Sequence, residues 1–147
     1  MEKFGLHVAD GAFFVGHTGL ILFNVFGWIF PNTRKWNLAT LLFTLAAWLL
    51  LGLFYGIGYC PLTEWHFQVR RALGYEDTSD TFVHLLILEV TGLNLSSRLV
   101  NASSGVVLAV SLAGSIATNV RDRLRARTTN VARKPEKATT AESDSVD

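Results

Sequence analysis

Apolar residues run through this chain in three long stretches, at 11–30, 36–59 and 99–118, and none of these contains Asp, Glu, Lys or Arg. Each stretch could cross the hydrocarbon core of a bilayer, which takes about 20 helical residues. A soluble helix of this length would carry a charged face, and these stretches have none. The pattern therefore predicts an all-α integral membrane bundle with three spanning helices.

The segment between the second and third stretches has a different pattern. Thr63 is a favourable N-cap residue and Gly74 is a favourable residue just after a helix, so we expect a short helix over 64–73. Its apolar residues Trp65 and Val69 fall four apart on one face. Such a helix is predicted to lie in the membrane interface or on the bundle rather than to cross the membrane.

Two arginines on this predicted helix, Arg70 and Arg71, are expected to face lipid headgroups or Glu89. Glu89 belongs to a further apolar run at 82–95, which also contains His84 and covers only about two thirds of a membrane thickness. We therefore predict an interfacial or re-entrant helix here, with a fourth crossing as the alternative. The whole region from 62 to 98 would then lie at the membrane surface.

Charge is distributed unevenly along the chain. Seven of its thirteen Lys and Arg residues follow the last apolar stretch, and Arg34 and Lys35 form a short basic loop between the first two. The positive-inside rule places this loop and the tail in the cytoplasm, and the amino terminus and the region after Cys60 outside. We divide the chain into a helical transmembrane domain at 1–120 and a polar, disordered tail at 121–147.

The basic residues after the last stretch suit contact with anionic lipid headgroups, so the bilayer itself is a predicted partner. Nucleic-acid binding is not expected, because no aromatic or folded platform accompanies the charge.

Polar and small residues follow helical spacing inside the predicted spans. His17 and Asn24 fall on one seam of the first helix. An ionisable group in hydrocarbon is costly, so His17 is a functional-site hypothesis, and packing with bonds to Asn24, Thr40 or Thr44 is the alternative. The third helix carries a ridge of small residues that could pack on a partner protein or on a second copy; the ridge is Gly105, Ala109, Ala113 and Ala117.

The sequence contains no catalytic motif, so we do not expect an enzyme. Candidate contacts for a cofactor or ligand are His17, Asn24, Tyr55 and Tyr59. A metal site could combine Cys60, the one cysteine, with Glu64, His66 and His84. The spacing from Cys60 to His66 matches no standard zinc site, so we expect neither a metal nor a cofactor.

Residues 58–66 read Gly-Tyr-Cys-Pro-Leu-Thr-Glu-Trp-His, and residues 23–28 read Phe-Asn-Val-Phe-Gly-Trp. These runs resemble a family of small bacterial inner-membrane proteins of unknown function, DUF2784. The residues that carry the resemblance in the first run and just after it are Cys60, Pro61, Thr63, Trp65, Arg70 and Arg71. The resemblance implies a multi-pass protein of the bacterial inner membrane, and it implies no activity, substrate or cofactor.

Two functions remain open from the sequence. A non-enzymatic structural or accessory membrane component would use the small-residue ridge and the outer amphipathic helices as contact surfaces. A ligand-binding protein would instead hold a quinone, lipid or haem between its helices, with His17 and Asn24 as contacts. The first function is favoured, because catalysis and redox chemistry need convergent polar groups that the sequence does not assemble.

Overall fold

The computed structural model describes residues 2–56, 59–76 and 79–143, and every regular element among them is a helix. Helix accounts for 82% of the structure, which confirms the all-α prediction. The helices are α1 (Glu2–Phe26), α2 (Arg34–Leu50), α3 (Gly52–Tyr55), α4 (Pro61–Leu73), α5 (Phe82–Thr91) and α6 (Ser97–Ser143).

Three segments of the described chain are long and apolar enough to cross a membrane, as predicted: Lys3–Phe26, Arg34–Tyr55 and Ser97–Thr129. α5 has 10 residues and is too short to cross. The structure therefore favours three crossings over four.

α1 ends at Phe26, before the predicted limit of the first span, in a turn that leads into α2. The Thr33 hydroxyl closes this turn by donating a hydrogen bond to the Gly27 carbonyl oxygen at 2.6 Å. A Cβ atom on Gly27 would lie 2.9 Å from Nδ2 of Asn37, closer than such atoms pack. The absence of a side chain at Gly27 thus lets the start of α2 approach the end of α1.

The predicted start of the helix after Cys60 was wrong. α4 begins at Pro61 with Cys60 at the N-cap, and no side chain caps it. Proline suits the first helical position because the amide hydrogen that it lacks would have no partner there. Thr63 consequently lies inside the first turn, where it is buried. The predicted end was correct, because Gly74 adopts the left-handed conformation with φ of 92°.

The buried face of α4 carries polar residues, and Trp65 lies outside it, which leaves the membrane interface as the predicted place of Trp65. Trp65 is 56% exposed, while His66 and Arg70 are buried. Burial of these polar side chains is possible because acidic residues on α1 and α5 lie opposite them.

α6 continues to Ser143, where the sequence predicts a disordered tail from residue 121. Arg, Ala, Lys and Glu dominate this stretch and have high helix propensity. Extending an existing helix also needs no new nucleation, so a polar sequence can continue it.

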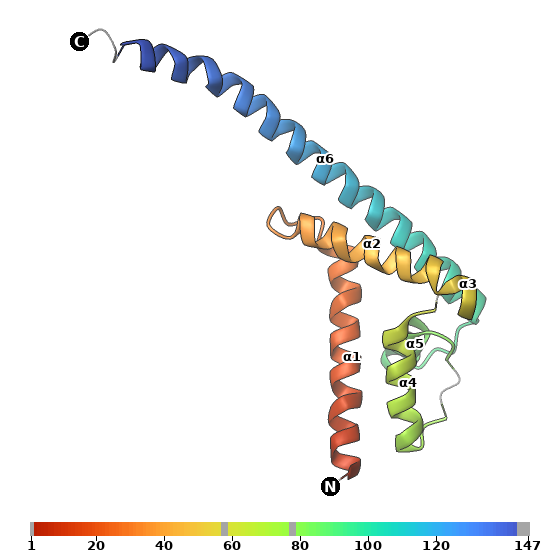
Figure 1. Ribbon diagram of the computed structural model, residues 1–147. Coiled ribbons are helices and arrows are strands. Elements are labelled where there is room, and N and C mark those ends of the chain that lie inside the picture. Colours follow the sequence, from red (N-terminus) through yellow and green to blue (C-terminus); the bar gives the residue numbers. More distant parts are fainter. Residues whose placement is uncertain (1, 57–58, 77–78, 144–147) are drawn as a thin grey trace.

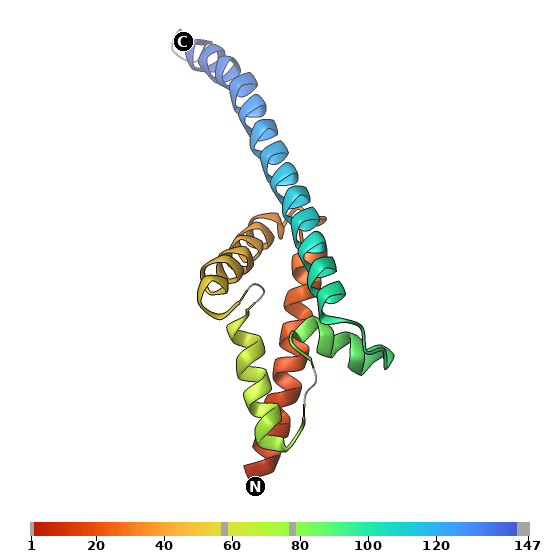
Figure 2. The same cartoon turned by 90° about the vertical axis from the view of Figure 1, so that its right-hand side faces the viewer.

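The helices form two packed pairs. α1 packs most extensively on α4, and α2 packs most extensively on α6. Figure 1 shows α2 running along α6, while α1 departs steeply from both and runs beside α4. After a quarter turn, Figure 2 shows α5 beside α1 and below the lower end of α6. An aromatic and aliphatic core of Phe67, Phe82 and Leu85 joins α4 and α5, with Phe14 and Ile21 of α1 packed against it.

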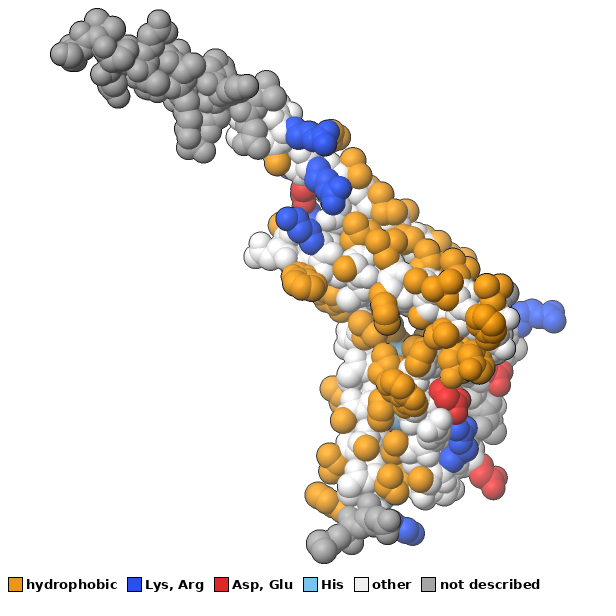
Figure 3. All heavy atoms as spheres, in the orientation of Figure 1, with side chains coloured by type: hydrophobic (Ala, Val, Ile, Leu, Met, Phe, Trp, Pro, Cys, Tyr) orange, Lys and Arg blue, Asp and Glu red, His pale blue; other side chains and the backbone are white. Residues whose placement is uncertain are grey.

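Apolar side chains dominate the outer surface of the long helices. Figure 3 shows hydrophobic side chains across the middle of one face, and charged side chains toward its two ends. The exposed residues include Val15 on α1, Phe43 on α2 and Val110 on α6. A surface of this kind suits lipid rather than water.

Candidate functional site

Asp10 of α1 is the centre of a charged cluster that joins three helices. Its Oδ1 atom lies 2.8 Å from Nε2 of His66 and 3.7 Å from Nη1 of Arg70, both on α4. Nη2 of Arg70 also donates to Oε1 of Glu89 on α5, at 3.1 Å. The side chains of His66 and Arg70 are 0% and 9% exposed, and those of Asp10 and Glu89 are 20% and 48% exposed, so the basic partners are shielded from water more than the acidic ones. We call these four residues the charged cluster.

Aromatic rings enclose the charged cluster. Phe13 stacks on His66 at a centroid distance of 5.7 Å, and the ring of Phe82 also lies 5.7 Å from that of His66. The Arg70 guanidinium lies 4.6 Å from the centroid of the Tyr75 ring, in cation–π geometry. Electrostatic interactions strengthen when water is excluded in this way.

His66, Arg70 and Glu89 were candidate residues from the sequence, and Asp10 was not. The predicted contact of Arg70 with Glu89 is confirmed. Asp10 comes just before the first uncharged stretch and was treated as outside it. One signal could have identified Asp10. It is an acidic residue at the edge of a predicted span, and the same chain contains a histidine and an arginine that can pair with it.

A second network of uncharged polar groups joins α1 to α2. Asn24 donates from Nδ2 to the Thr44 hydroxyl at 3.2 Å and accepts from the Thr40 hydroxyl at 2.8 Å. Asn37 is fully buried and donates to the carbonyl oxygen of Phe23 at 2.7 Å. We call Asn24, Asn37, Thr40 and Thr44 the amide network.

His17 is buried on the same seam as Asn24, as the helical spacing predicts, and Leu22 on another face of α1 is 52% exposed. The predicted bonds from His17 to Asn24 or to the threonines do not form. The imidazole instead stacks on Phe82 at a centroid distance of 4.1 Å, with the planes 7° apart. Its Nδ1 atom is buried and has no hydrogen-bond partner in the described structure.

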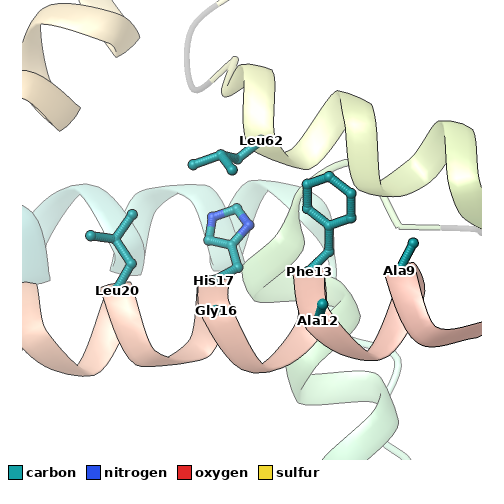
Figure 4. A pocket seen from close by; sticks show the side chains of 7 residues that line it. All are labelled: Ala9, Ala12, Phe13, Gly16, His17, Leu20 and Leu62. Carbon is teal, nitrogen blue, oxygen red and sulfur yellow. The ribbon is translucent and has the colours of Figure 1, made fainter.

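His17 borders two hollows. One is an open groove of about 500 Å³ between α1 and the start of α4, and Figure 4 shows the imidazole pointing from α1 toward Leu62 across it. The other is an inner cavity of about 130 Å³ that reaches Asn24 and Cys60. The inner cavity adjoins a further cavity of about 200 Å³ between α1, α2 and α6, with which it shares Asn24 and Trp48.

The other predicted site residues lie in separate places. Tyr55 and Tyr59 stack on each other at 4.7 Å and line a further hollow, which His17 does not line but which shares Cys60 and Thr63 with the inner cavity. The Nε2 atom of His84 lies 3.1 Å from Oδ1 of Asn94, and His66 contacts Asp10. In the part of the chain that the structure describes, no group of three or more His, Cys, Asp or Glu side chains is placed to hold a metal ion.

At the opposite end of the molecule, Arg34 fastens the turn before α2 to α6. Its Nη1 atom donates to both carboxylate oxygens of Asp122, at 3.0 and 2.8 Å. Asn119 donates to the Arg34 carbonyl oxygen at 3.1 Å. Trp28 also packs on α6, where a Cβ atom on Gly114 would lie 3.2 Å from its ring.

Comparison with protein-family models matches residues 7–120 to the family described as "Protein of Unknown function (DUF2784)". The chain belongs to this family. No curated protein and no solved structure matches it. The DUF2784 match includes the charged cluster, the amide network and His17, and it stops before Asp122.

Proposed function

We propose that this DUF2784 protein is a non-enzymatic accessory or structural component of the bacterial inner membrane. The observation that carries the proposal is that its buried charged and amide side chains are engaged with one another. The Asp10 carboxylate and the His66 imidazole, a pair capable of acid–base chemistry, contact each other and are enclosed by aromatic rings. Their contacts join helices, as do those of Asn24 and Asn37.

We further propose that the ridge of small residues on α6 is the contact surface for another membrane helix, from a partner protein or a second copy. The opposite face of α6 is covered, with Ser111 and Ser115 buried. Ala109, Ala113 and Ala117 are exposed. Small residues allow helix backbones to approach closely in lipid, where no hydrophobic effect drives association.

The proposed topology places the turn before α2 and the end of α6 in the cytoplasm. The ion pair between Arg34 and Asp122 supports this, because it requires both residues to lie on one side of the membrane. A four-crossing chain would separate them. The charged cluster and Cys60 would then lie toward the outer side.

Thiol labelling tests the topology, because Cys60 is the one cysteine, is free and is partly exposed. A membrane-impermeant maleimide should label Cys60 in intact spheroplasts. Labelling that requires disrupted membranes would contradict the proposed orientation.

Cross-linking in native membranes tests the ridge. Wild type should give a cross-linked species larger than the monomer, and Ala113→Leu should reduce its yield several-fold. Ala46→Leu, which makes the same change at an exposed position on α2, is the control and should leave the yield unchanged. A wild-type chain that remains monomeric, or equal yields from both variants, would contradict a contact role for the ridge.

A further inference from the structure

The two inner cavities together have the properties of a small-molecule binding site, which the accessory role proposed above does not require. The residues of the described chain that line them include no Asp, Glu, Lys or Arg. Small-molecule sites are mostly apolar and carry a few convergent polar groups that fix the orientation of the ligand. The space between α1, α2, α5 and α6 has this composition.

The polar groups gather in the smaller cavity. They come from α1, α4 and α6 among other segments and include His17, Asn24, Thr63, Asn101 and Ser104. The adjoining cavity is lined mainly by apolar side chains, among them Val25, Leu41, Val83 and Leu108. The two cavities therefore offer a polar chamber and an apolar extension, which fits a ligand with a polar head and an apolar tail.

His17 supplies the observation that points to a ligand. The residue is nine-tenths buried, borders the polar chamber, and has a buried Nδ1 atom without a hydrogen-bond partner. Leaving a buried polar atom unpaired is costly, and such atoms in native structures normally have a protein, water or ligand partner. Its stacking on Phe82 holds the ring in place, so the nitrogen has a fixed position.

The chemistry of the lining narrows the ligand class. Without a cation, the chamber gives no compensation for a buried phosphate or carboxylate, so the headgroup is neutral. The chamber volume of about 130 Å³ is close to that of an engineered cavity that holds benzene, about 150 Å³. Trp48 and Phe82 add flat aromatic surfaces to its wall.

From these observations we infer that the space between α1, α2, α5 and α6 binds one neutral, ring-headed lipid of the isoprenoid-quinone class. An oxygen of the ring pairs with His17, and the tail follows the apolar extension toward Ser111. This inference narrows the ligand-binding alternative from the sequence to one chemical class. It is independent of the α6 contact surface, because a helix-docking protein needs no internal ligand.

Tryptophan quenching by a short-chain ubiquinone analogue tests the inference on the full-length protein in mild detergent. Trp48 lines both cavities, whereas Trp36 and Trp65 are 73% and 56% exposed and would report quinone in the micelle. Both exposed tryptophans are therefore changed to Phe in the reporter protein. Quenching should be saturable with one site per chain, and 1-decanol at equal concentration should not displace the quinone.

Matched variants then locate the site. His17→Leu should weaken binding about tenfold, the effect of losing one hydrogen bond of about 1.4 kcal/mol. Ser104→Leu should abolish saturable binding, because it fills both cavities while leaving the polar side chains of α1 and α2 in place. Leu22→Ala and Ala102→Leu, at exposed positions on α1 and α6, are the controls and should bind as wild type.

Three results would overturn the inference. Quenching that never saturates shows that the quinone only partitions into the micelle. If 1-decanol displaces the bound quinone as effectively as free quinone does, the site recognises only an alkyl tail and not the quinone ring. Equal affinity of wild type and the folded Ser104→Leu protein, judged by its helical circular dichroism and elution volume, shows that the quinone binds elsewhere.

Discussion

α1 contacts α4 through charged groups, and it contacts α2 through amides and hydroxyls. The first contact centres on Asp10, close to the chain start, and the second centres on Asn24, near the end of the same helix. Charged pairs shielded from water interact strongly but leave a large penalty when one partner is lost. Neutral hydrogen bonds between membrane helices contribute less, and their loss costs less.

This difference corresponds to the position of each contact along α1. The amide network lies within the predicted spans at 11–30 and 36–59, where a full charge would be costly. The charged cluster lies at the end of the span, where α4 and α5 cover it. The chain thus carries its charges where surface helices can shield them, and the following predictions test this division.

The largest effect is expected from Asp10→Asn. The change leaves His66 and Arg70 buried without their shared carboxylate, so it should lower the free energy of unfolding by about 3 kcal/mol. Unfolding by SDS titration of the protein in detergent micelles measures this. His7→Gln, at an exposed position one turn earlier, should have little effect. Equal losses from the two variants would show that the charged cluster does not hold α4 on α1.

A smaller loss is expected from Gly27→Ala in the turn between α1 and α2. The added methyl would lie 2.5 Å from the Phe23 carbonyl oxygen and 2.9 Å from Asn37, so the turn must shift. We expect a loss of about 2 kcal/mol, typical of overpacking. Gly19→Ala provides a matched control, since no atom lies within 4 Å of that position. A tolerated Gly27→Ala would contradict the close approach of the two helices.

The sequence was sufficient to predict the spans, because few soluble structures contain charge-free apolar stretches of this length. It also predicted that His17 and Asn24 are buried together, since helical spacing fixes which residues share a face. The end of α4 at Gly74 was equally predictable from local backbone preference.

The buried face of α4 was not predictable from its own sequence. His66 and Arg70 are buried because Asp10 and Glu89 lie opposite them, and the contact of His66 with Asp10 joins residues 56 positions apart. The local pattern of Trp65 and Val69 does not reveal this face. The start of α4 was wrong for a local reason, because Pro61 at the first helical position outcompetes a cap at Thr63.

A loss of about 1 kcal/mol is expected from Asn24→Leu, which removes the two side-chain bonds to Thr40 and Thr44 while keeping an apolar residue in the span. The same SDS titration measures the loss. Leu22→Ala on the exposed face is the comparison. If Asn24→Leu is as harmful as Asp10→Asn, the proposed difference between charged and neutral contacts is wrong.

The smallest effect is expected on the exposed side of α4, where Arg71 donates to Glu64 at 2.7 Å. Hydrogen bonds from Arg71 and Gln68 hold the pKa of Glu64 below its ordinary value of 4.5. A carboxylate with a lowered pKa stabilises the fold above its ordinary value, and the contribution is lost as the pH falls through the lowered pKa. Because the pair faces water, Arg71→Met should cost less than about 1 kcal/mol at pH 7. Two measurements compare wild type with Arg71→Met. The first is the rate of trypsin cleavage after Arg70 at pH 7, and the second is the free energy of SDS unfolding at pH 7 and pH 3. The stability difference should be smaller at the lower pH, and an equal difference at both pH values would show that Arg71 stabilises α4 through packing rather than through the Glu64 carboxylate.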